Sequence, residues 1–232
     1  MKADKPFVSA VIVGAGNGTR MGGKNKALIK IGEKTAFRLV LEAFEKSSTV
    51  DELVVVCRDA EEMKTQSEGI TKRISYVKGG KTRSESVSNG IKACKRGSEF
   101  YCIHDCARPL VTAQIIDSVV SAAFKKGAAT ACAPVNDTVK YVDRESGTVY
   151  TPDRSRLIAV QTPQVFESKL YLISAAMAKK DGVSATDDTT LAEHAGFAVE
   201  YVESATPNFK LTRTEDVYLA RLIAKLSEKE GQ

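Results

Sequence analysis

Long apolar runs are missing from this chain of 232 residues, and none approaches the length needed to cross a bilayer. Aromatic residues make up only 6% of the sequence, and the cations are dispersed, without the aromatic pattern of RNA-binding domains. Only two histidines are present, His104 and His194, and neither accompanies a G-x-S-x-G motif. The sequence therefore argues against a membrane protein, a nucleic-acid-binding protein and a serine hydrolase.

Cysteine is scarce, and its five positions include no C-x-x-C pair. Most of these cysteines lie in apolar runs, which is typical of buried free thiols. Cys102, His104 and Cys106 alternate along the sequence CIHDC and would share one face of a strand, an arrangement that can hold zinc. Because no fourth ligand lies nearby in the sequence, we favour a strand that leads into an active-site turn over a metal site.

The overall composition, 43% hydrophobic and 27% charged with a net charge of +5, is that of an ordinary globular chain. We expect residues 1–232 to form a single domain, because no linker or repeat interrupts them. The first strand follows closely on Met1, which leaves no room for a leader peptide, so we expect a cytoplasmic protein. The mild positive charge favours anionic small molecules as ligands.

The most informative stretch runs from Val8 to Lys26, with the sequence VSAVIVGAGNGTRMGGKNK. Its first six residues are mostly apolar and β-branched, as expected of a strand buried on both faces. Glycines and other small residues follow, and their backbone N–H groups can line a nest for anionic oxygens. Cations come directly after this turn, among them Arg20 and Lys26. This order predicts a polyphosphate-binding site.

Two well-known phosphate motifs fail in this stretch. The dinucleotide fingerprint G-x-G-x-x-G needs a glycine where Thr19 stands. The P-loop pattern fits Gly18, Gly23 and Lys24 but needs a hydroxyl where Asn25 stands. The segment G-x-G-T-R-M, followed by a lysine, instead resembles the nucleotidyltransferases that join a sugar phosphate to a nucleotide.

Strand-like and helix-like segments alternate along most of the chain. Buried strands are predicted at residues 8–13, 52–57, 74–77, 100–104 and 128–135, with a late strand at 199–202. Such alternation predicts an α/β fold with right-handed crossovers and a mostly parallel sheet. Because ligands bind at the carboxyl ends of parallel strands, the turn at residues 14–18, Gly80 and Asp105 should meet at one edge of the sheet.

Residues 136–161 interrupt this alternation with two β-like runs around a Ser-Gly turn and a third run behind them. A polar hairpin of this size buries little by itself. We expect an arm that packs on a second subunit, because four of its side chains are apolar and need cover: Tyr141, Val142, Val149 and Tyr150.

A final helix is predicted near the C-terminus. It carries four apolar side chains on one face: Leu219, Leu222, Ile223 and Leu226. Thr212 and Glu215, just before and within its first turn, have the spacing of a capping box.

Six phrases together resemble one family: AGNGTRM, GGKTRSESV, HDCARP, PVNDTVK, TPQVF and NFKLTRTED. In these phrases the chain is similar to the 2-C-methyl-D-erythritol 4-phosphate cytidylyltransferases, from the first strand to the last helix. The resemblance implies a Rossmann-like, three-layer α/β/α nucleotidyltransferase fold with a protruding β-arm, and a homodimer built through that arm. It also implies transfer of CMP from CTP to 2-C-methyl-D-erythritol 4-phosphate, with Mg²⁺, giving 4-diphosphocytidyl-2-C-methyl-D-erythritol and pyrophosphate.

The resemblance further implies roles for individual residues. The catalytic candidates are Arg20 and Lys26 along the triphosphate, and Arg154 and Lys210 at the acceptor. The nucleotide-binding candidates are Gly14, Ala15, Gly16, Gly18, Gly80, Arg83, Ser86, Asp105 and Cys106. The acceptor-binding candidates, besides Arg154 and Lys210, are Thr138, Thr162 and Thr186. Asp105 is also the candidate Mg²⁺ ligand, with Arg108 as its structural partner.

One departure and two alternatives accompany this interpretation. Cys106 stands where the family usually has alanine, and we expect it to make the site sensitive to thiol reagents. A ribitol 5-phosphate cytidylyltransferase would share the fold and the CTP half; the segments PVNDTVK and TPQVF, with the Asp153-Arg154 pair, favour methylerythritol phosphate. A non-catalytic nucleotide-binding regulator is the alternative from another class, and it would not need the cations that are present here.

Overall fold

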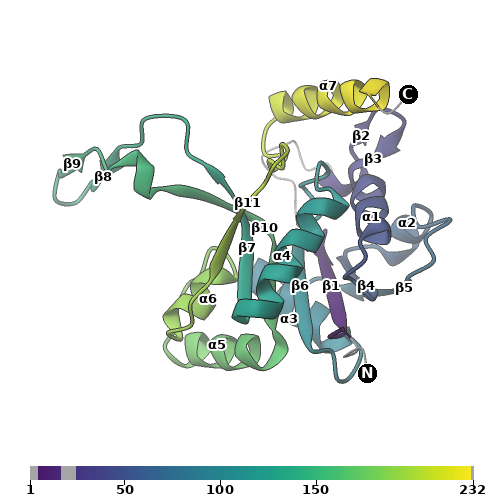
Figure 1. Cartoon of the computed structure of the whole chain (residues 1–232), viewed down its shortest axis with the longest axis horizontal. Coiled ribbons are helices and arrows are strands. Elements are labelled where there is room, and N and C mark those ends of the chain that lie inside the picture. Colours follow the sequence, from purple (N-terminus) through teal and green to yellow (C-terminus); the bar gives the residue numbers. More distant parts are fainter. Residues whose placement is uncertain (1–4, 17–24, 231–232) are drawn as a thin grey trace.

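The computed structural model describes residues 5–16 and 25–230 of the chain. A seven-stranded sheet forms its centre, in the order β11-β7-β10-β6-β1-β4-β5 (Figure 1). Its strands are β1 (Val8–Val13), β4 (Glu52–Cys57), β5 (Arg73–Lys78), β6 (Phe100–Asp105), β7 (Ala128–Pro134), β10 (Ile158–Glu167) and β11 (Glu200–Glu203). Each strand that the apolar runs predict is therefore present.

The sheet is mostly parallel, as the alternation of strands and helices predicts. Strand β1 pairs in parallel with β4 and β6, β4 with β5, and β11 with β7. The exception is β10, which lies antiparallel between β6 and β7. It contains the phrase TPQVF and reaches the sheet from the direction of the arm, so it enters between two strands that would otherwise be neighbours.

Helices cover both faces of the sheet, which gives the predicted three-layer α/β/α fold. On one face, α1 (Ala36–Lys46), α2 (Ala60–Lys64) and α4 (Ala113–Lys126) pack on side chains such as Ile12 and Val55. On the other, α3 (Arg83–Ala93), α5 (Ser168–Lys180) and α6 (Thr189–His194) pack on Val11, Ile103 and Phe166. The alternating side chains of the central strands thus feed two separate cores.

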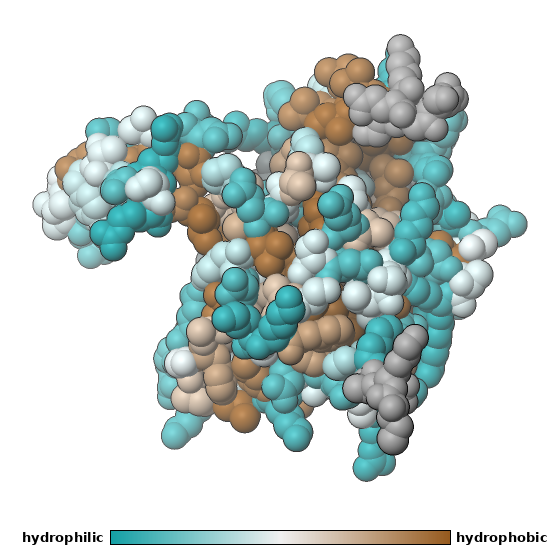
Figure 2. Space-filling model, in the orientation of Figure 1, coloured by the Kyte–Doolittle hydropathy of each residue, from teal (hydrophilic) through white to brown (hydrophobic). Residues whose placement is uncertain are grey.

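Helix α7 (Thr214–Glu230) lies apart from these layers, against a small hairpin of β2 (Lys30–Ile31) and β3 (Lys34–Thr35). It buries Val217 and Ala220, whereas the side of the helix with Leu219, Leu222 and Leu226 is about half exposed. Figure 2 shows apolar residues in the region of α7. The apolar spacing predicts the helix correctly. However, most of the leucine side chains that define this spacing lie on an exposed face of the helix and not on the face that is buried in this chain.

The start of α7 differs from the predicted capping box. Thr212 and the backbone N–H of Arg213 bond to Asp216 and not to Glu215, with donor–acceptor distances of 2.7 Å. The prediction chose the wrong acidic residue, because two carboxylates lie within reach of the turn and the spacing alone does not choose between them.

Between β7 and β10 the chain leaves the body of the molecule as a long arm, at the left of Figure 1. The arm contains β8 (Tyr141–Val142), β9 (Val149–Tyr150) and the short helix η3 (Arg154–Arg156). The rings of Tyr141 and Tyr150 stack with centroids 4.9 Å apart, yet the apolar side chains of β8 and β9 are 49–59% exposed.

Within the described residues, no helix combines the length and apolar character that crossing a membrane requires.

The strand register brings several turns to one edge of the sheet. Val13 at the end of β1 lies beside Asp105 on β6 and beside Val56 on β4. The turn after β5 packs so closely on the turn after β1 that a Cβ at Gly79 would lie 2.2 Å from the Cβ of Ala15. Only glycine fits there, and its absence of a side chain lets the two turns form one continuous surface.

Candidate active site

A cavity of about 530 Å³ opens at this edge of the sheet. Residues from five separate parts of the chain line it: the end of β1 with the turn after it, residues 26–27, the turn before α3 with the start of that helix, the end of β6 with the turn after it, and the segment before α7. The lining residues are Val13, Gly14, Ala15, Gly16, Lys26, Ala27, Gly80, Lys81, Thr82, Arg83, Ser86, Asp105, Cys106, Ala107, Lys210 and Thr212. Among these residues there are four cationic side chains and one carboxylate, so the cavity suits a polyanion.

The turn before α3 is held by its own hydroxyls. Ser86 Oγ accepts a hydrogen bond from the backbone N–H of Gly80 (3.0 Å) and donates to the carbonyl of Thr82 (2.9 Å). Thr82 in turn caps the helix by accepting from the backbone N–H of Glu85 (3.1 Å). These bonds fix the shape of the turn at the cavity wall. The Ser86 hydroxyl lines the cavity but is already hydrogen-bonded within the turn.

Asp105 is the charged centre of the cavity. Its Oδ2 accepts from Lys210 Nζ at 2.5 Å, and its Oδ1 accepts from Arg83 Nε at 3.2 Å. Burial opposes ionisation of this carboxyl, but the charges of Arg83 and Lys210 outweigh burial and hold its pKa well below the usual range. Arg108, predicted to pair with Asp105, instead donates from Nη1 to the carbonyl of Asn208 (2.8 Å), and its charge lowers the Asp105 pKa less than those of Arg83 and Lys210 do.

Lys210 reaches the cavity because the extended segment 208–212 crosses the edge of the sheet, and Lys26 is hydrogen-bonded to this segment. The backbone N–H of Leu211 donates to the carbonyl of Ala107 (2.8 Å), and Lys26 Nζ donates to the carbonyl of Leu211 (2.8 Å). Lys26 begins the short helix η2 (Lys26–Leu28), which Asn25 caps. Residues nearly two hundred positions apart are thereby joined at one wall of the cavity.

A buried histidine supports Asp105 from below. The hydroxyl of Thr162 accepts from the backbone N–H of Asp105 and contacts His104 Nδ1, both at 3.1 Å, and His104 Nε2 lies 3.3 Å from the carbonyl of Arg108. A neutral imidazole with its proton on Nε2 satisfies all of these contacts. Thr162, a predicted acceptor-binding residue, therefore has its hydroxyl engaged beneath Asp105 and is not among the cavity-lining residues.

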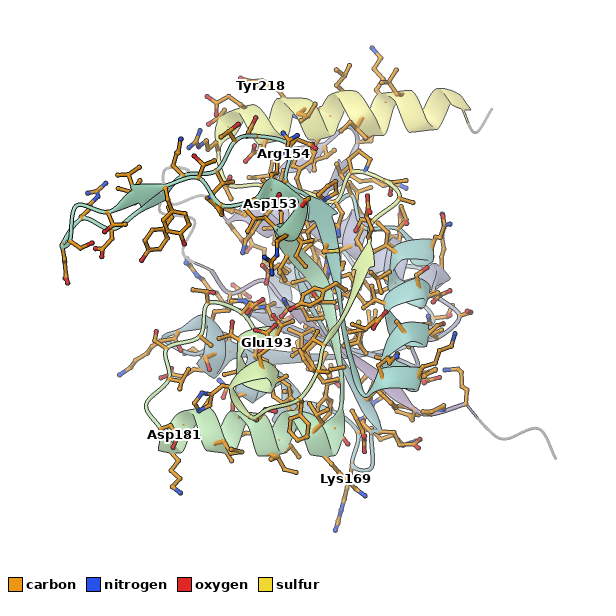
Figure 3. The ribbon with its side chains drawn as sticks, turned by 60° about the vertical axis from the view of Figure 1, so that its left-hand side comes forward. Asp153, Arg154, Lys169, Asp181, Glu193 and Tyr218 are labelled. Atoms are coloured by element: carbon orange, nitrogen blue, oxygen red, sulfur yellow. The ribbon has the colours of Figure 1, made fainter. Side chains whose placement is uncertain are left out.

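The residues predicted for the acceptor are not all brought together in one chain. Thr138, Arg154 and Thr186 are exposed. Arg154 donates to the carbonyl of Asn136 (2.6 Å) at the root of the arm, where Figure 3 shows it beside Asp153. It lines a second cavity, of about 610 Å³, which shares no lining residue with the first. Arg20 and Gly18 lie outside the described residues, so their predicted roles stay predictions.

Cys106 lines the cavity, and its side chain lies next to Gly14. The residue is 2% exposed, and burial raises the pKa of its thiol well above the ordinary value. Because the thiolate is the reactive form, this placement argues against the thiol sensitivity that the sequence suggested. Cys102 and His104 are also buried, and among the described residues no group of three or more His, Cys, Asp or Glu is placed to hold a metal ion.

Sequence reasoning missed one contact of the site. Arg83 also donates from Nη1 to Asp188 Oδ2 at 2.7 Å, and Asp188 is 3% exposed at the start of α6. The only signal in the sequence is an acidic pair, Asp187 and Asp188, before a short helix, and that pattern is more commonly a plain helix start.

The protein has a nucleotidyltransferase-like fold, with a mostly parallel sheet between two layers of helices. The carboxyl edge of this sheet carries the glycine turn, the cations and the ionised carboxylate of the cavity. Solved structures agree: the 4-diphosphocytidyl-2C-methyl-D-erythritol synthase of Anaerococcus prevotii superposes with a TM-score of 0.85 at 29% identity, covering 95% of this chain and 96% of that one. The 2-C-methyl-D-erythritol 4-phosphate cytidylyltransferase of Thermus thermophilus superposes with a TM-score of 0.77 at 30% identity, covering 94% and 99%.

Sequence comparison narrows the class further. The family model described as IspD, 2-C-methyl-D-erythritol 4-phosphate cytidylyltransferase, matches residues 8–226. Relatives of that name from Caldanaerobacter subterraneus and Bacillus cereus are 39% and 38% identical over 224 residues, covering 94% of this chain and 99% and 98% of the relatives. This chain belongs to the 2-C-methyl-D-erythritol 4-phosphate cytidylyltransferase family.

The buried His104 predicts a loss of stability in mild acid. Burial lowers the pKa of His104 to about 4, whereas the pKa of a histidine in an unfolded chain is about 6.5. Between these values the unfolded chain binds a proton that the folded chain does not, so stability present above pH 6.5 is lost as the pH falls. We expect His104 to cost about 2 kcal/mol of the free energy of unfolding between pH 6.5 and 5.

Urea denaturation of the wild type and of His104→Gln at both pH values measures this effect. Glutamine keeps hydrogen-bonding groups in place but does not titrate, so the variant should lose less stability on acidification. An equal loss in both proteins would contradict the assignment.

Proposed function

We propose that this chain transfers CMP from CTP to 2-C-methyl-D-erythritol 4-phosphate, and that it does so in the cytoplasm. The observation that carries the proposal is the cavity at the strand ends, where Arg83 and Lys210 pair with Asp105 and Lys26 lines the same wall. Two polyanions have to meet in this reaction, so charge neutralisation and alignment are the main tasks of the protein. Membership in the family supports this choice of nucleotide and acceptor.

The chemistry is a displacement at phosphorus. An oxygen of the acceptor phosphate attacks the α-phosphorus of CTP, and a new P–O bond forms. The bond from the α-phosphorus to the bridging oxygen breaks, and its electron pair leaves with pyrophosphate. In this proposal Arg20 and Lys26 stabilise the charge on the triphosphate, while Lys210 holds the acceptor phosphate.

The base and ribose of CTP would lie against the small residues of the cavity. These are Gly14, Ala15, Gly16, Gly80 and Ser86, which line it without bulky side chains. Gly80 cannot carry a side chain, because its Cβ would lie 2.3 Å from the Cβ of Glu85. Glycine is therefore required for the turn to pack against the first turn of α3.

A divalent cation is part of the proposal, and the residues present fit one. Asp105 is a hard carboxylate kept ionised by its neighbours, and Mg²⁺ is commonly bound by one or two carboxylates together with substrate phosphates. When bound, Mg²⁺ would neutralise charge on the triphosphate. The contribution of the chain itself is to hold Asp105 ionised at the end of β6.

We further propose a homodimer in which the arm, residues 136–161 of the single domain 1–232, completes the acceptor site of a second copy. Arg154 and Lys210, the two cations proposed for the acceptor, line separate cavities in one chain. The apolar side chains of β8 and β9 are exposed and need cover. A second copy would supply that cover and bring Thr138 and Arg154 to a site that contains Lys210 and Thr186.

The proposed reaction predicts pyrophosphate release only when the correct acceptor accompanies CTP and Mg²⁺. We expect release with 2-C-methyl-D-erythritol 4-phosphate and much slower release with ribitol 5-phosphate in a coupled pyrophosphate assay. Faster release with ribitol 5-phosphate would make the alternative acceptor correct. Release with neither, together with a CTP-dependent rise in melting temperature, would favour a nucleotide-binding regulator.

The two lysines should fail in different ways. Removing one charge that stabilises the transition state costs about 3 kcal/mol, so Lys26→Ala should lower kcat by about 100-fold. Lys210→Ala should raise the KM for the acceptor while CTP still binds. Steady-state kinetics and calorimetric titration with CTP measure both effects.

Lys169→Ala is the matched control, because Lys169 is exposed at the end of the molecule opposite α7 and the root of the arm (Figure 3). It should retain wild-type kinetics. An unchanged acceptor KM in Lys210→Ala would show that the acceptor site is misplaced.

The arm should control assembly. Val142 and Val149 pair across the hairpin and are 55% and 59% exposed. Burying each in a dimer contributes about 1.5 kcal/mol, so changing both to serine should weaken dimerisation about 100-fold or more. Sedimentation equilibrium measures this, and changing the neighbouring Arg144 and Glu145 to serine is the control. A wild type that is monomeric at all concentrations, yet active, would contradict the shared site.

A further inference from the structure

One guanidinium joins two buried acids at the floor of the cavity. Arg83 donates from Nε to Asp105 Oδ1 (3.2 Å) and from Nη1 to Asp188 Oδ2 (2.7 Å). The side chain of Asp105 is 10% exposed, that of Asp188 3%, and that of Arg83 29%. Asp105 lines the cavity and Asp188 does not, so Arg83 connects the site to a carboxylate that lies outside it.

Asp188 is held in place from behind. The Tyr171 hydroxyl, on α5, donates to Asp188 Oδ1 (2.9 Å). The backbone N–H of Asp188 donates to Gln164 Oε1 (2.9 Å) on β10. Figure 1 shows α5 and α6 together at one side of the sheet. Because these partners are buried parts of the fold, the Asp188 carboxylate has a fixed position. Arg83 is its ion-pair partner, although burial outweighs this attraction and raises the pKa of the carboxyl.

The two carboxylates compete for Arg83. Burial lowers the pKa of the guanidinium, but the attraction of Asp188, followed by that of Asp105, outweighs burial and raises it. The contact with Asp188 is also the shorter of the two. A guanidinium can grip a single carboxylate with two parallel hydrogen bonds. Without Asp188, the Arg83 side chain would be free to reorient as a whole, so that its guanidinium could grip Asp105 with two hydrogen bonds, although Asp105 already accepts from Lys210.

We propose that Asp188 is a positioning residue that fixes the orientation of the Arg83 guanidinium, so that Asp105 receives only one of its hydrogen bonds and stays available to the divalent cation that accompanies the nucleotide. The inference rests on the proposed function, in which Asp105 is the metal ligand. Asp188 touches neither substrate nor metal in this scheme and acts through Arg83 alone.

Metal binding in the absence of turnover tests the inference. Mn²⁺ is titrated into the full chain with CTP and without acceptor, and water proton relaxation reports the protein-bound ion. Asp188→Asn keeps the size of the side chain but removes its charge. Outer positions of this kind typically change metal affinity by about 10-fold or more, so the Mn²⁺ midpoint should rise by about 10-fold.

Two control variants separate positioning from stability. Tyr171→Phe removes a hydrogen bond to the same buried carboxylate but leaves its contact with Arg83, and Ser174→Ala removes a buried hydroxyl of α5 that donates to the carbonyl of Leu170. Both should lower the melting temperature while keeping the Mn²⁺ midpoint within about twofold of the wild type. A shift in Tyr171→Phe equal to that in Asp188→Asn would overturn the inference, because general loosening would then explain both.

A double mutant gives the sharpest test. In an Arg83→Gln background there is no guanidinium to compete for, so Asp188→Asn should shift the midpoint no further. An undiminished shift in that background, or a wild-type midpoint in Asp188→Asn, overturns the inference. Should Asp188→Asn lack a cooperative unfolding transition, Asp188→Ser, which also removes the charge, replaces it, and a wild-type midpoint there counts equally against the inference. A wild type that binds no Mn²⁺ with CTP would remove the proposed function itself.

Discussion

The charges around Asp105 govern how the cavity is built. Its carboxylate lies at the end of β6, largely removed from water, and stays ionised because Arg83 and Lys210 approach it from two sides. An unpaired buried carboxylate would be very costly, so the acid and its two cations depend on one another. In the proposed function the same cations attract a polyphosphate, so folding and ligand binding would depend on one group of charges.

Topology explains how these charges meet. Parallel strands β1, β4, β5 and β6 all end at one edge, so the turns that follow them share a surface. The segment 208–212 then crosses this edge, held by Leu211 to Ala107 and to Lys26. Behind the surface, Thr162 and His104 on one side and Asp188 and Tyr171 on the other fix the groups that face the cavity. The visible site is thus one layer of a buried polar network.

Much of the fold could be predicted from the sequence, because apolar periodicity and turn residues are local properties. The strands, the order of elements and the meeting of Gly14, Gly80 and Asp105 at one edge follow from such patterns. Lys210 was different: its place in the site came from the family resemblance, and no local pattern leads to it. The C-terminal helix illustrates the limit, because periodicity finds the stripe of Leu219 and Leu222 but cannot say whether anything covers it.

By itself, the sequence determined which segments are strands and helices and where the chain turns, and it predicted a polyphosphate site after the first strand. Only the tertiary structure decided that Arg83 serves two carboxylates, that Thr162 lies beneath Asp105, and that Arg154 lies in a separate cavity from Lys210. The physical reason is that secondary structure depends on neighbouring residues, whereas an ion pair depends on where distant segments are brought together.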